Sequence, residues 1–221
     1  MRKVPTPSGP FPFQLYFEDL GEIDEICLEA LERQSLLPSN PAPIRIERFV
    51  EKEFKTALRY EDLGPDNLGC TIFNAARVEA ILVSRSLEEQ NTTPARRRVR
   101  STVAHEAGHG LLHGSLFRED NFPDLGENQR RILCRSEDIL GETQRSYRGR
   151  WWEFQAIQAI GSLLLPRSLM DTFLDQSGIK LGFSENRILS PVQRESLAKK
   201  AAVTFDVNPI VARIRLDSLF S

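Results

Sequence analysis

The sequence predicts an α+β fold in which a small sheet lies between groups of helices. Two observations carry this prediction. Three short strand-like segments follow one another within residues 57–83, separated by Gly, Pro, Asn and Asp. Apolar residues at helical spacing precede and follow them, an order typical of α+β folds. The chain has 221 residues, of which 40% are hydrophobic, so it can bury a core without disulfides.

The first part of the chain predicts an arm, two helices and the strands. Residues 1–15 carry prolines at positions 5, 7, 10 and 12 and predict an extended, proline-rich arm. A helix is expected over 18–33, followed by a proline-rich connection at 37–43. Next comes a helix whose apolar face is Ile46, Phe49, Val50 and Phe54. Strands are expected at 57–60, 69–73 and 78–83.

A long central helix is predicted over about 93–113. Thr92 or Thr93 can cap its start, Pro94 suits its first turn, and Gly114 is expected to end it. Beyond it, residues 115–150 are polar and irregular, with one strand candidate at 132–134. The last predicted helices are an apolar one over 151–165, which ends at Pro166, and two short ones within 191–219.

Two glycines interrupt the central helix, Gly108 and Gly110. Each costs about 1 kcal/mol relative to alanine inside a helix, so both need a reason. Close approach to a strand or substrate and simple tight packing are equally good reasons, and the sequence leaves both open.

Charge and cysteine content limit the class of protein. Acidic residues number 31 and basic residues 29, so the net charge of −2 does not favour nucleic acid as a direct partner. Cys27, Cys70 and Cys134 are widely spaced and predict a reducing compartment, the cytoplasm. We find neither a signal-peptide pattern nor an apolar stretch long enough to span a membrane, and expect no membrane partner.

All three histidines fall within nine residues, and two of them form a known metal motif. His105, Glu106 and His109 make H-E-x-x-H on the central helix. Residues four apart on a helix differ by about 40°, so the two imidazoles can meet at one ion. Glu106 is rotated by about 100° and can instead act as general base toward a metal-activated water. A chance match on a structural helix is the alternative.

A catalytic zinc needs a third protein ligand. His113 lies about 12 Å along the helix from His105, so it cannot bind the same ion. We expect it to pack or to support a ligand, with packing favoured. The remaining candidates are carboxylates, Glu127, Glu137, Asp138, Glu142 and Glu153. Glu153 stands out because a charge on an apolar helix is expensive to bury unpaired, although it could also be a helix-start carboxylate.

Three segments in this order resemble the ImmA/IrrE family of metallopeptidases. They are residues 97–113 around the motif, 151–166 from Trp-Trp-Glu to Leu-Pro, and 197–216 at the C-terminus, and the resemblance covers roughly residues 40–218. One departure is Ile157, where the family often has Asn or Asp. It puts in doubt a hydrogen bond that supports a ligand.

The resemblance implies a zinc-dependent endopeptidase with a minimal zincin fold. It implies His105, His109 and Glu153 as zinc ligands and Glu106 as general base. Family members typically cleave a helix-turn-helix repressor and so derepress mobile-element or stress genes. On this basis we divide the chain into an N-terminal arm and helix (1–40), a zincin-like metallopeptidase domain (41–190) and a C-terminal helix-turn-helix-like segment packed on it (191–221).

Two other functions are considered. A DNA- or protein-binding regulatory module with a vestigial or structural zinc site would use residues 191–219, with DNA candidates Lys199, Lys200, Arg213 and Arg215. The arginines at 96, 97, 98 and 100 are interpreted as a solvated or ion-paired face. A deformylase-like hydrolase would need Cys70 on the ion.

For the peptidase, substrate is expected to add as a strand along a sheet edge, with residues 69–73 as the candidate. Tyr147, Arg148 and Arg150 are candidates to stabilise the oxyanion. The sequence predicts no particular oligomeric state.

Overall fold

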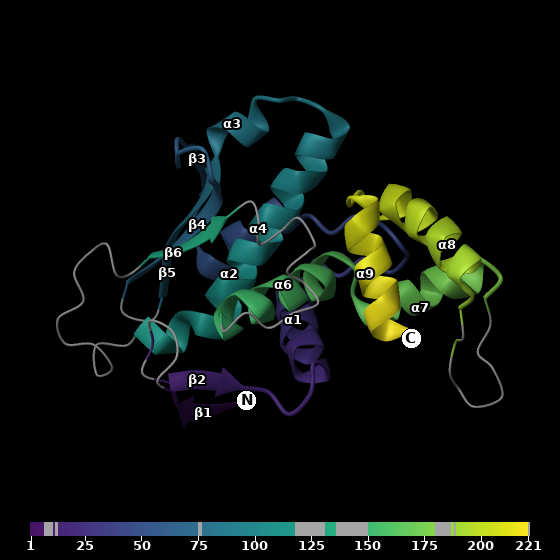
Figure 1. The fold of residues 1–221 in the computed structure, drawn as a ribbon, viewed down its shortest axis with the longest axis horizontal. Coiled ribbons are helices and arrows are strands. Elements are labelled where there is room, and N and C mark those ends of the chain that lie inside the picture. The colour runs from purple at the N-terminus through teal and green to yellow at the C-terminus, as the bar shows by residue number, and fades with distance from the viewer. Residues whose placement is uncertain are drawn as a thin grey trace.

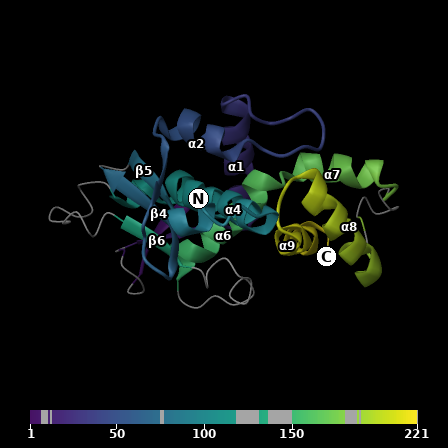
Figure 2. The ribbon, with the colours of Figure 1, turned by 90° about the horizontal axis from the view of Figure 1, so that it is seen from above.

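The computed structural model describes residues 1–6, 11, 13–74, 77–117, 131–135, 150–179, 187 and 189–220. In this part of the chain, eight helices and one 3-10 turn accompany two small sheets (Figure 1). The predicted α+β class is confirmed. Seen from above, α4 and α6 lie between the larger sheet and the C-terminal helices α7, α8 and α9 (Figure 2).

The larger sheet has the strand order β3-β5-β4-β6. Strands β3 (Leu58–Glu61), β4 (Asn67–Asn74) and β5 (Arg77–Ser84) confirm the three predicted strands, and β6 (Arg131–Arg135) confirms the fourth candidate. Strand β4 pairs antiparallel with both β5 and β6, whereas β3 runs parallel to β5. The expectation that residues 69–73 offer a free edge to a substrate is therefore wrong, because both sides of β4 already pair within the sheet.

The motif helix α4 (Thr93–His113) crosses one face of this sheet, beside α2 (Ile46–Phe54). The Thr92 side chain accepts a hydrogen bond from the Ala95 N–H at 3.2 Å, which confirms the predicted cap. Gly114 has a right-handed φ of −51° and leads into a 3-10 turn (Gly114–Phe117), so the helix ends by tightening rather than by a left-handed glycine.

Two further helices pack on α4 and build the main core. Helix α6 (Trp151–Leu164) crosses it, and α1 (Gly21–Arg33) packs mainly on α6. The short α3 (Arg85–Glu88) joins β5 to α4, and α7 (Arg167–Gln176) follows Pro166, where α6 was predicted to end. None of the helices in the described ranges is long and apolar enough to cross a membrane.

Tight packing on a helix explains Gly108, and Gly110 packs both on a helix and on Val78 of strand β5, so the expected approach to a strand is confirmed there. A Cβ at Gly108 would lie 2.7 Å from the Ala159 Cβ of α6, and one at Gly110 would lie 2.7 Å from the Phe54 ring of α2. The first contact allows α4 and α6 to approach closely at the level of the motif histidines.

We predict that Gly108→Ala destabilises the protein although alanine is the better helix former. The gain in helix propensity is about 1 kcal/mol, whereas overpacking between two rigid helices costs about 1–3 kcal/mol. Urea unfolding should therefore show a net loss of up to about 2 kcal/mol. The double variant Gly108→Ala/Ala159→Gly should recover most of it, and a Gly108→Ala protein more stable than the wild type would contradict this packing argument.

The N-terminal arm contains two strands that we did not predict. β1 (Arg2–Pro5) and β2 (Phe13–Tyr16) pair antiparallel, with Lys3 opposite Leu15. Leu15 is fully buried, and the Phe11 ring lies 5.8 Å from the Trp151 ring at the start of α6. The arm therefore packs on the helix that carries Glu153.

The C-terminal helices are fastened to the motif helix through an ion-paired turn. α8 (Pro191–Thr204) and α9 (Pro209–Leu219) confirm the two predicted helices. Between them, Asp206 has a left-handed φ of 50° and accepts hydrogen bonds from Arg96 at 3.4 Å and Arg97 at 3.0 Å. Arg100 donates to the Asp206 carbonyl at 3.0 Å. The ion-paired interpretation of this arginine cluster is confirmed for these three members.

Candidate metal centre

Two histidines of α4 and a carboxylate of α6 converge in the buried interior. His105 Nε2 lies 3.0 Å from His109 Nε2 and 3.1 Å from Glu153 Oε2, and His109 Nε2 lies 3.6 Å from the same oxygen. All three residues are buried. Within the described ranges, this is the one group of at least three His, Cys, Asp or Glu side chains whose ligand atoms come together.

The donor atoms and their spacing fit a metal ion. Tetrahedral zinc with bonds of about 2.0–2.2 Å places two ligand atoms about 3.3 Å apart. The observed separations of 3.0, 3.1 and 3.6 Å bracket that distance. Two imidazole nitrogens and one carboxylate oxygen also form a donor set that suits transition metals. The three residues can therefore hold one ion together.

Helix geometry and helix packing explain this convergence. His105 and His109 share a face of α4 because they are four residues apart. Glu153 is the third residue of α6, where the helix dipole favours a carboxylate. Both interpretations of Glu153 therefore apply, as it lies in the first helical turn and also meets the histidines.

The charge states of these residues suit ligands. Burial acts to raise the pKa of Glu153, but the charge that His109 and His105 carry when protonated, together with their hydrogen bonds to the carboxylate, holds that pKa well below its usual range. Burial lowers the pKa of His109, against the opposing effect of Glu153. An ionised carboxylate and a neutral imidazole are the forms that bind metal ions.

Glu106 is buried and held against the sheet by strand β4. The Thr71 hydroxyl lies 2.6 Å from Glu106 Oε2 and 3.0 Å from the Glu106 carbonyl, and the shorter contact is a hydrogen bond to the carboxylate. Gly69 makes room for this side chain, because a Cβ there would lie 2.5 Å from Glu106 Oε1. Neither Gly69 nor Thr71 is predicted from the sequence to support Glu106. Their only sequence signal is alternation, which places 69 and 71 on one face of the strand.

His113 contacts a candidate ligand directly. Its Nδ1 lies 2.9 Å from His109 Nδ1, and its Nε2 lies 3.0 Å from Gln155 Oε1. The preferred expectation of packing for His113 is wrong because both ring nitrogens have polar partners, whereas the alternative, support of a ligand, agrees with its contact to His109. Whatever Ile157 fails to supply, His109 has a polar partner in His113 on its own helix.

Several predicted site residues cannot be placed. The ligand candidates Glu127, Glu137, Asp138 and Glu142 and the oxyanion candidates Tyr147 and Arg148 lie outside the described residues. Arg150 precedes α6 as its N-cap residue. Cys70 packs with Ala80 and Leu82 on the sheet face opposite to Thr71, so it does not join the histidines as a deformylase-like site would require.

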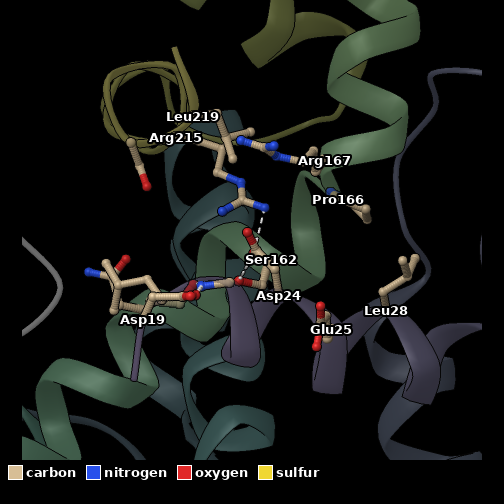
Figure 3. A pocket seen from close by; sticks show the side chains of 13 residues that line it. Asp19, Asp24, Glu25, Leu28, Ser162, Pro166, Arg167, Arg215 and Leu219 are labelled. Atoms are coloured by element: carbon tan, nitrogen blue, oxygen red, sulfur yellow. Dashed lines mark hydrogen bonds and ion pairs between the residues drawn. The ribbon is translucent and has the colours of Figure 1, made fainter. Parts of the chain in front are cut away.

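A cavity of about 480 Å³ lies between α1, α6 and α9 (Figure 3). Arg215 of α9 points toward Asp24 of α1 there (Figure 3). It is only 5% exposed, and it donates to Asp24 Oδ1 at 2.7 Å and to the Leu165 carbonyl at 3.0 Å. Ser162 of α6 donates to the same carboxylate. Arg215 therefore ties three helices together and is not available as a DNA contact.

No family model matches the chain, and no curated protein matches it. The assignment to a family therefore stays a prediction from the three motif segments.

Proposed function

We propose that this protein is a zinc-dependent endopeptidase of zincin-like fold that works in the cytoplasm. The observation that carries the proposal is the convergence of His105, His109 and Glu153, with Glu106 held by Thr71 on the adjacent strand. Two histidines and one glutamate are the ligand set of catalytic zinc sites, which keep a further position for water. A structural zinc site usually has four protein ligands, whereas three converge among the residues that the structure describes, which is a second reason to favour catalysis.

The chain's own residues supply the remaining chemistry. A zinc ion held by these three ligands would polarise the scissile carbonyl and acidify the attacking water. Glu106 is the group proposed to accept the proton of that water and to return it to the leaving amine. The hydrogen bond from Thr71 keeps one carboxylate oxygen in a fixed orientation during both transfers.

Thr71→Val is predicted to lower kcat/KM by about 10–100-fold without loss of zinc, because it removes a hydrogen bond to a charged group worth about 1.5–3 kcal/mol. Thr71→Ser keeps the hydroxyl and should stay close to the wild type. Steady-state cleavage and metal content measured on the same preparations test this. Equal loss in the valine and serine variants would instead indicate a general disturbance of packing around residue 71, because valine keeps the methyl group and serine keeps the hydroxyl.

The proposed substrate is a helix-turn-helix repressor, whose cleavage would derepress mobile-element or stress genes. It is supported by the motif resemblance and by the net charge of −2, which favours a protein over DNA. The test incubates the purified protein with a repressor encoded beside it, with and without a chelator, and adds zinc back. We expect zinc-dependent cleavage and about one zinc per chain. Bound zinc without cleavage of any repressor offered would instead support a binding module with a structural site.

A further inference from the structure

We infer that His113 and Gln155 are positioning residues that fix the tautomer of His109. A backbone carbonyl of the N-terminal hairpin orients Gln155, and the effect passes through His113 to His109. The contacts form one continuous chain. Gln155 Nε2 lies 2.6 Å from the Leu15 carbonyl, Gln155 Oε1 lies 3.0 Å from His113 Nε2, and His113 Nδ1 lies 2.9 Å from His109 Nδ1. We name these four residues the histidine relay. Every member is buried.

The relay begins at Leu15, whose carbonyl sets the orientation of the Gln155 amide. A carbonyl oxygen can only accept a hydrogen bond, so the Gln155 atom that faces it must be the amide nitrogen. The amide oxygen of Gln155 then faces His113. The usual ambiguity between the two ends of a glutamine amide is thereby removed by the backbone.

The orientation of Gln155 in turn sets the tautomer of His113. Gln155 Oε1 only accepts, so His113 must carry its hydrogen on Nε2 and donate there. A neutral imidazole has a single N–H, which leaves His113 Nδ1 as an acceptor. His109 must then carry its hydrogen on Nδ1 to complete the 2.9 Å contact.

The result is a free lone pair on the metal-facing nitrogen of His109. With its hydrogen on Nδ1, His109 presents Nε2 unprotonated, and this is the atom next to His105 and Glu153. The opposite tautomer would place a hydrogen on Nε2 and block ligation. Each step follows from the previous one, so the relay admits only this pattern of hydrogens for neutral rings.

The relay is held rigid by its surroundings. Leu15 is fully buried on β2, and the Trp151 ring packs edge-on against His113 at 5.7 Å. The N-terminal hairpin thus contributes to the metal centre although no side chain of it is a ligand. The inference rests on the proposed metal centre but not on the proposed peptidase activity.

Two matched substitutions at His113, to Asn and to Leu, distinguish a role as hydrogen-bond acceptor for His109 from a role in packing alone. Asn and Leu both branch at Cγ as histidine does, but only Asn has an acceptor oxygen at the δ position, where Nδ1 stands. Both variants lose the hydrogen bond to Gln155, so the cost to stability is shared. The Kd for Zn²⁺ is measured by competition with a chromophoric chelator.

We expect His113→Leu to raise the Kd for Zn²⁺ about 10–100-fold, the usual effect of losing a partner of a metal ligand. His113→Asn should stay within about threefold of the wild type, because it can still accept from His109 Nδ1. Equal weakening in both variants would overturn the relay. A wild-type protein that does not bind Zn²⁺ at all would instead overturn the proposed metal centre.

A second measurement needs no variant. The chain has only three histidines, so ¹⁵N-histidine labelling gives a short imidazole spectrum of the wild-type protein. After metal removal, at neutral pH, two-bond ¹H–¹⁵N correlations report which nitrogen of each ring carries the hydrogen. We expect Nε2–H for His113 and Nδ1–H for His109. The reverse assignment for either ring would overturn the relay even if the variants fail to fold.

Discussion

Glu106→Gln is expected to lower kcat for peptide cleavage by about 10²–10⁴-fold, the usual contribution of a general base, while zinc content stays at the wild-type level. Glutamine has nearly the same shape as glutamate and can still accept a hydrogen bond from Thr71 through its amide oxygen. It cannot take a proton from water at neutral pH. The substitution therefore removes the proposed chemistry and keeps the geometry.

The measurement compares cleavage rates and metal content of the same purified samples. Glu29→Gln, at an exposed carboxylate of α1, is the matched control and should cleave at the wild-type rate. Full activity in Glu106→Gln would refute the assignment of Glu106 as base. Loss of zinc together with activity would show that this carboxylate supports the ligands instead.

The convergence of His105, His109 and Glu153 could be predicted from the period of one helix and from the cost of burying an unpaired charge. His105 and His109 are brought together by a single helix, whose period is known from the sequence. Glu153 could be selected because a charge on an apolar helix needs a partner. The structure places it beside both histidines, 48 residues from His105 in the chain.

The supporting residues could not be predicted because they depend on contacts between distant segments. Gln155 meets a carbonyl 140 residues away, and Thr71 meets Glu106 across 35 residues. The spacing of these residues in the sequence does not predict such contacts. His113 was misjudged for the same reason, since its role depends on Gln155 of another helix.

The position of a strand within a sheet is also a property of the whole chain. Residues 69–73 were recognised as a strand, but their place between β5 and β6 depends on the return of residues 131–135 to the sheet. Arg215 gave an equally incomplete signal. Its charge suggested a surface role, whereas its partners Asp24 and the Leu165 carbonyl lie on helices far away in sequence.

Glu153→Gln is expected to abolish zinc binding at concentrations that saturate the wild type. It removes the one ionised ligand of the three and keeps the side-chain volume. The loss of affinity should exceed the ~100-fold that follows loss of a partner outside the ligand set. Because glutamine is neutral, the variant leaves no unpaired charge between the two helices, and the protein should still fold.

Thermal unfolding with and without zinc measures this loss directly. An ion that binds only the folded state stabilises it by about 2.7 kcal/mol at a concentration 100 times Kd. For a chain of this size that corresponds to a rise in Tm of about 5–10 °C, which the wild type and Glu29→Gln should both show. Glu153→Gln should show no rise at the same concentration, and a chelator should remove the rise from the wild type. A similar zinc-induced shift in Glu153→Gln would mean that the third ligand is another carboxylate. Glu153 would then only join α6 to α4 through its contacts with the histidines, without binding the ion.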